Sequence, residues 1–123
     1  MLSQLLLGRP QVIVDFEFER GLLFLSVQNI GSRSARTIKT RFDRSFTGAD
    51  GVDTSAMNLF SHLAFLPPGK QIRTFVDSAT DYFARDEPVL ITTTTAYADD
   101  TGRQFSSSTL HDLRIYQDIR YVE

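Results

Sequence analysis

The sequence predicts an all-β protein built as an antiparallel β-sandwich of about seven short strands. Three observations predict this fold: side chains alternate with a period of two along several stretches, turn residues separate these stretches, and no stretch shows the apolar spacing of a three-turn helix. At 123 residues the chain fits one domain that buries about two-thirds of its unfolded surface. We expect a sandwich over 11–115, an N-terminal tail over 1–10 and a C-terminal tail over 116–123.

The clearest element is a β-hairpin in the stretch 12–29, where apolar residues alternate with polar ones. Arg20 and Gly21 supply a two-residue turn, because glycine takes positive φ without strain. A turn at this place sets the register of the two strands, and a slip of one residue would scatter the apolar side chains. The predicted register gathers six large side chains on one face: Val14, Phe16, Phe18, Leu23, Leu25 and Val27.

The middle of the chain predicts a third strand and then a long loop. Alternation over 34–42 places Arg36, Ile38, Thr40 and Phe42 on one side of the strand. The stretch 43–58 is rich in Gly, Asp, Ser and Thr. Long loops in compact domains are typically functional or mobile, and we expect a loop of that kind here.

The second half continues the rhythm of strands and turns. Pro67-Pro68-Gly69 predicts a type II turn, followed by a strand over 71–77 in which Phe75 points away from Val76. A short helical turn is predicted over 81–85, before Pro88.

A final hairpin joins strands over 89–98 and 103–113. A three-residue loop with Gly102 in the left-handed region pairs Tyr97 with Phe105 and Ile91 with His111.

This pattern favours an immunoglobulin-like sandwich over a closed barrel. Residues 27–35, V-Q-N-I-G-S-R-S-A, resemble the second-to-third strand segment of prokaryotic immunoglobulin-like modules of the CARDB type. In those modules an L-x-P-G turn and a late Y-x-D-x-x-G hairpin follow. Here 66–69 read L-P-P-G and 97–102 read Y-A-D-D-T-G. The resemblance covers roughly residues 12–113, and it implies a non-catalytic binding or spacer module of the cell surface.

The composition of the chain limits the classes of partner that we expect. The net charge of −2 gives no general attraction to nucleic acid or to anionic membranes. There is no Cys for a disulfide or a Cys-ligated zinc site, and no stretch approaches the ~20 apolar residues that cross a bilayer. We therefore expect no cofactor, no nucleic acid and no membrane insertion. The location depends on the extent of the natural chain: cytoplasmic if this chain is complete, cell-surface if it is excised from an adhesion-type protein.

Catalytic patterns are absent from the sequence. His62 and His111 stand alone, and no nucleophile, phosphate-loop or HExxH motif accompanies them. We therefore expect a protein that is not an enzyme. One basic cluster occurs, without the interleaved aromatics that stack on bases, and we expect acids of the first strand to offset it. The cluster is Arg33, Arg36, Lys39, Arg41 and Arg44, and the acids are Asp15, Glu17 and Glu19.

Small-ligand binding is the alternative function. Calcium takes six to eight oxygen ligands, and acids gather in the 43–58 loop and at the last hairpin tip. Threonine and serine runs in the final hairpin could bind sugars, although both residue types also suit strand pairing. The acids are Asp43, Asp50, Asp53, Asp99 and Asp100, and the runs are 92–95 and 106–109.

The outer face of the first hairpin gives the leading hypothesis. The register that buries six apolar residues turns Ile13, Leu22 and Phe24 outward among acids. These three side chains either form part of a protein–protein surface or lie under a loop or the Leu-rich N-terminal tail. We predict a non-catalytic protein-interaction or assembly module with a protein partner or a second copy, and a carbohydrate- or calcium-binding sandwich as the alternative.

Overall fold

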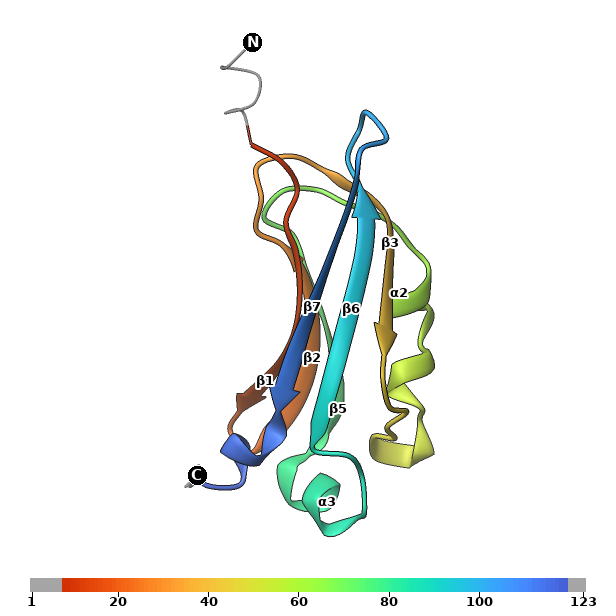
Figure 1. The fold of residues 1–123 in the computed structure, drawn as a ribbon. Coiled ribbons are helices and arrows are strands. Elements are labelled where there is room, and N and C mark those ends of the chain that lie inside the picture. The colour runs from red at the N-terminus through yellow and green to blue at the C-terminus, as the bar shows by residue number, and fades with distance from the viewer. Residues whose placement is uncertain (1–7, 120–123) are drawn as a thin grey trace.

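The computed structural model describes residues 8–119, which fold into two antiparallel sheets packed face to face (Figure 1). One sheet has the strand order β1-β2-β5 and the other has the order β4-β3-β6-β7. The seven strands are β1 (Val12–Glu19), β2 (Leu22–Asn29), β3 (Ala35–Phe42), β4 (Leu63–Leu66), β5 (Gln71–Ser78), β6 (Leu90–Ala98) and β7 (Gln104–Asp112). The helical turns are η1 (Ala49–Gly51), η2 (Thr54–Ala56), α2 (Asn58–Ser61), α3 (Ala79–Ala84) and η3 (Leu113–Tyr116). This arrangement confirms the predicted all-β class and the number of strands.

The first hairpin has the predicted register. Phe18 pairs with Leu23 and Phe16 with Leu25, and the turn residues Arg20 and Gly21 have φ values of 52° and 79°. Two positive φ values match the right-handed twist of the flanking strands, which explains why this short turn is stable. Five of the six predicted inward side chains are fully buried, and Phe18 packs against the core from its edge.

The last hairpin is also confirmed. Tyr97 pairs with Phe105 and Ile91 with His111, and Gly102 takes a φ of 87° at the tip. β1 begins at one end of the sandwich and β7 ends at the other (Figure 1).

The predicted alternation in the third strand is wrong at its start. Ala35 and Ile38 are both buried, although they are three residues apart, and Arg36 is exposed. Thr37 has a φ of 54°, and the pairing between β3 and β6 shifts between Arg36 and Lys39. A bulge adds one residue and reverses the side-chain alternation, so Arg36 does not share a face with Ile38.

The stretch 43–58 is more ordered than a simple loop. It contains η1 and η2 and leads into α2. Phe46 is almost fully buried, and its ring centroid lies 5.5 Å from that of Phe16 and 5.4 Å from that of Phe42. This one aromatic side chain ties the stretch to the core between the two sheets. No helix within residues 8–119 is long and apolar enough to cross a membrane.

Asn29, at the end of β2, is fully buried and connects four parts of the chain. Its Oδ1 accepts hydrogen bonds from the backbone N–H of Gln11 (3.1 Å) and Gly31 (2.9 Å). Its Nδ2 donates to the carbonyls of Arg33 (2.7 Å) and Leu66 (3.0 Å). Leu66 belongs to the opposite sheet, so the carboxamide joins the two sheets at this end.

Replacing Asn29 with Ala should cost about 2–4 kcal/mol of unfolding free energy, because buried backbone donors and acceptors lose their partners. Urea denaturation followed by circular dichroism measures this loss. The neighbouring Gln28→Ala should stay within about 0.5 kcal/mol of the wild type. Equal stabilities of the two variants would show that the Asn29 hydrogen bonds do not stabilise the fold.

Candidate functional site

The outer face of the β1-β2-β5 sheet carries the three side chains predicted to point outward. Leu22 pairs with Glu19, Phe24 with Glu17, and Ile13 with Gln28 at the far end of the hairpin. Four residues of a strand, about 13 Å, separate Ile13 from Glu17. The structure therefore brings Leu22 and Phe24 together and leaves Ile13 apart from them.

Phe75 and Arg73 of β5 complete the cluster around Phe24. Phe75 lies directly opposite Phe24 in the pairing of β2 with β5, and the two rings meet edge to face at 5.9 Å. The Arg73 guanidinium lies 3.9 Å from the centroid of the Phe24 ring. We call Leu22, Phe24, Arg73 and Phe75 the aromatic face. Alternation separates Phe75 from Val76 on the two sides of the strand, but it does not reveal which side faces outward or which strand lies beside it.

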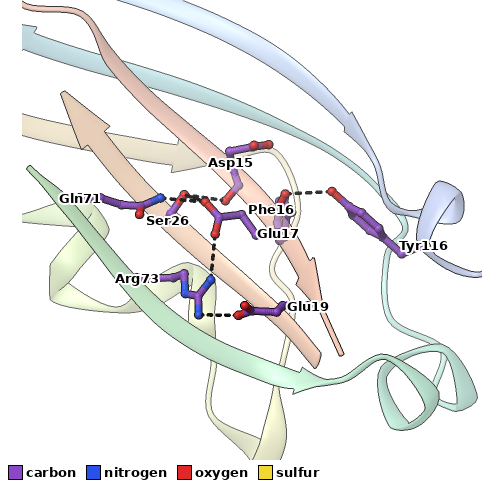
Figure 2. A network of polar contacts seen from close by, with 8 residues as sticks. All are labelled: Asp15, Phe16, Glu17, Glu19, Ser26, Gln71, Arg73 and Tyr116. Atoms are coloured by element: carbon purple, nitrogen blue, oxygen red, sulfur yellow. Dashed lines mark hydrogen bonds and ion pairs between the residues drawn. The ribbon is translucent and has the colours of Figure 1, made fainter. Parts of the chain in front are cut away.

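A polar network fixes Arg73 on the aromatic face (Figure 2). Arg73 Nη1 lies 3.2 Å from Glu17 Oε1 and Nη2 lies 3.0 Å from Glu19 Oε1. Glu17 Oε2 also accepts hydrogen bonds from Ser26 Oγ and from Gln71 Nε2, both at 2.8 Å. Hydrogen bonds to Glu19 and Glu17 raise the pKa of Arg73. The network links all three strands of the sheet and keeps the guanidinium over Phe24.

The aromatic face is open to solvent in the described part of the chain. Phe75 is 48% exposed and Leu22 is 37% exposed. A loop was one of the two predicted covers, and the loops within residues 8–119 leave both side chains partly exposed. Residues 1–7 of the Leu-rich tail, the other predicted cover, lie outside the described residues.

A groove runs between the edges of β1 and β7. Its larger part has a volume of about 560 Å³ and is lined by hydroxyl side chains and one aromatic pair. Ile13 lines this groove rather than the aromatic face. The hydroxyls are Thr93, Thr95, Ser106, Ser107 and Thr109, and the aromatic pair is Tyr97 and Phe105, stacked at 5.6 Å.

His111 lies under the second part of the groove. Thr93 Oγ1 is 3.1 Å from His111 Nε2, the Phe16 ring contacts the imidazole edge to face, and Asp15 Oδ1 is 3.8 Å from Nδ1. Burial lowers the pKa of His111, and the charge of Asp15 partly opposes this shift. The imidazole is therefore neutral near pH 7 and acts as a packed core group.

Tyr116 closes the same end of the sandwich. Its ring stacks on Phe18 at 5.6 Å and its hydroxyl donates to the carbonyl of Phe16 at 2.9 Å (Figure 2). The chain beyond the last strand thus packs on the first hairpin.

Four of the five acids considered as calcium ligands have other partners. Asp43 Oδ1 accepts from the N–H of Thr92, Asp53 Oδ1 from Ser55 Oγ, and Asp99 Oδ1 from the N–H groups of Thr101 and Arg103. Asp100 pairs with Arg36 at 2.7 Å, and Asp50 has a positive φ within η1. Within residues 8–119, no three acids or histidines lie close enough to hold a metal ion together.

The predicted basic cluster follows β3 in the other sheet. Arg36, Lys39 and Arg41 belong to β3, with Arg33 before it and Arg44 after it. The acids of β1 point from the outer face of the opposite sheet, where Glu17 and Glu19 meet Arg73. The partner of Arg36 is instead Asp100, at the tip of the last hairpin.

An ion pair between the buried Asp77 and the partly exposed Arg85 closes the end of the sandwich near α3. Asp77, nearly buried, lies 2.6 Å from Arg85 Nη1, and this hydrogen bond raises the pKa of Arg85. Arg85 Nη2 donates to the carbonyl of Thr47, whose N–H donates to Glu87. Each charge has a structural partner, so this cluster anchors the 43–58 stretch to α3.

These features define an antiparallel β-sandwich domain with one exposed aromatic face. A family model described as a domain of unknown function (DUF8453) matches residues 5–117, and the chain belongs to this family. No curated protein and no solved structure matches the chain.

Burial of His111 predicts a pH dependence of stability. Its pKa is lower in the folded state than in the unfolded chain, so the unfolded chain binds the proton more readily. Stability is therefore retained above the ordinary histidine pKa and decreases as the pH falls from about 7.5 to about 5.5. Urea denaturation at several pH values measures the decrease.

Replacing His111 with Gln should make this decrease smaller, whereas the exposed His62→Gln should behave as the wild type. An unchanged slope in His111→Gln would assign the pH dependence to other groups.

Proposed function

We propose that this domain is a non-catalytic protein-interaction module that binds a protein partner through the aromatic face. The observation that carries the proposal is the exposed Phe75 beside Phe24, with Arg73 held over the ring by two glutamates. Phenylalanine and arginine are enriched at protein interfaces, and aromatic side chains are less common on the rest of the protein surface. A fixed Arg73 also loses less side-chain freedom on binding than a mobile one.

The charges around the aromatic face suggest the chemistry of the partner. Asp15, Glu17 and Glu19 point outward from β1, and Arg73 pairs with Glu17 and Glu19 but not with Asp15. The surroundings of the face are therefore acidic. A partner with an apolar centre and a basic rim would complement it, whereas a second copy of the same face would bring acids together.

An immunoglobulin-like fold is part of the proposal. The first, second and fifth strands form one sheet, and the third, sixth and seventh strands belong to the other. Immunoglobulin-like sandwiches divide their strands A, B and E from C, F and G in the same way. The N-I-G, P-P-G and D-D-T-G motifs also lie at turns between strands, as in the CARDB-type modules that the sequence resembles.

Phe75→Asp should abolish capture of the partner when the immobilised domain is incubated with an extract of its native cells. The matched control is Phe65→Asp, since Phe65 is 44% exposed and lies under Arg36 at 4.8 Å on the other sheet. Both variants add one carboxylate to a strand surface close to an arginine: Phe75→Asp beside the Phe24 ring that Arg73 covers, and Phe65→Asp under Arg36. Mass spectrometry should find a protein that the wild type and Phe65→Asp retain and Phe75→Asp loses.

The retained protein, once purified, is then titrated against each form. Phe75→Asp should bind at least about 30-fold more weakly than Phe65→Asp, as expected for the central side chain of an interface. Similar affinities for both variants, or the same proteins retained by all three forms, would refute the aromatic face as the binding surface.

A further inference from the structure

The outer edge of β7 is an open strand edge. β7 pairs with β6 at nine consecutive positions without a register shift, and among the described residues no strand pairs with its other side. Five consecutive residues, 106–110, are exposed, including Leu110 at 65%. Side chains on both faces of β7 are thus exposed, because β1 packs over β6 and does not cover β7.

The other three sheet edges carry features that prevent strand addition. β4 has four residues and is followed by Pro67 and Pro68. The pairing of β5 with β2 contains a bulge, and Gly48 lies directly against the carbonyl of Val76 on that edge. β1 presents acids at three successive outward positions, Asp15, Glu17 and Glu19.

β7 has none of these protective features. From Gln104 to Leu110 it contains no charged residue, no proline, no glycine and no bulge. Charged side chains, prolines and bulges are the usual means by which proteins blunt an edge strand. The hydroxyl side chains keep the edge compatible with water while it is unpaired, and they also pair well across strands.

We propose that β7 pairs antiparallel with β7 of a second copy of this chain. The two four-stranded sheets then join into one sheet of eight strands across a two-fold axis. This inference concerns a surface and a partner different from those of the aromatic face, so either proposal can fail alone.

The charge distribution favours a second copy as the occupant. Antiparallel pairing of β7 with itself sets serine, threonine, leucine and glutamine opposite one another, so no like charges meet. Arg103 precedes the strand and Asp112 ends it, so each Arg103 comes near the acidic end of the other copy. Self-pairing of β1 would instead set Asp15, Glu17 and Glu19 against the same acids.

Symmetry restricts the register. A two-fold axis perpendicular to the sheet keeps each side chain on its own face, so a residue can pair only with residues of its own alternation. Ser106, Ser108 and Leu110 therefore meet only one another or Gln104 and Asp112 on the outer face. When the two-fold axis lies near residues 106–108, charges placed at 106 and 108 of one copy are close to the same positions of the other copy.

The test introduces like or opposite charges at these two positions. Wild-type protein should show a concentration-dependent dimer in analytical ultracentrifugation. The double variant Ser106→Lys/Ser108→Lys should raise the dimer dissociation constant at least about tenfold, and so should Ser106→Glu/Ser108→Glu. Mixing the two double variants should restore the dimer, because lysines then face glutamates.

The control Ser106→Thr/Ser108→Thr keeps the strand neutral and should dimerise as the wild type does. Circular dichroism and thermal melting identify a double variant that fails to fold, and restoration on mixing requires two folded partners. A wild-type protein that is monomeric at all concentrations overturns the proposal. A dimer that ignores the charges, or that Phe75→Asp abolishes, also overturns it.

Discussion

Four hydrogen bonds meet at the Asn29 carboxamide, and they connect the approach to β1, the turn after β2, the loop before β3 and the end of β4. A carboxamide has two N–H donors and two acceptor lone pairs. Asn29 uses all four, because Nδ2 donates two hydrogen bonds and Oδ1 accepts two. Aspartate could accept the two N–H groups but could not donate to the two carbonyls. Gly31 completes the arrangement, since a Cβ there would collide with the backbone of Arg9 and Pro10. The relative position of the two sheets at this end depends on these contacts.

Local pairing could be predicted from the sequence, whereas pairing between distant segments could not. Both hairpins have the expected register, because a short turn and strict alternation determine which residues face each other. The pairing of β2 with β5 joins residues about fifty positions apart and leaves no local pattern. The sequence placed Phe75 only on the side of its strand opposite Val76, and it did not predict that Phe75 lies beside Phe24. The candidate surface changed for this reason: Phe75 and Arg73 joined Leu22 and Phe24, and Ile13 was found at the groove.

The differences within single elements also have physical causes. Alternation assumes that each residue of a strand faces one residue of the neighbouring strand. The bulge at Thr37 breaks that assumption, because this residue takes a left-handed conformation. Composition suggested a loop over 43–58, and its many turn residues do form short helical turns. Composition could not show that Phe46 enters the core, since one aromatic residue among polar neighbours has no periodicity.

The positions of the start of β1 and the end of β7 at opposite ends of the sandwich have a mechanical consequence (Figure 1). A tension applied between these two points acts along β1 and β7, and these strands hydrogen-bond to β2 and β6. Inter-strand hydrogen bonds lie perpendicular to antiparallel strands, so such a load strains many of them at once in shear. Pulling from a single end would open the same bonds one after another. A load along the length of the sandwich is therefore opposed by whole strand pairs in shear, not by one hydrogen bond at a time.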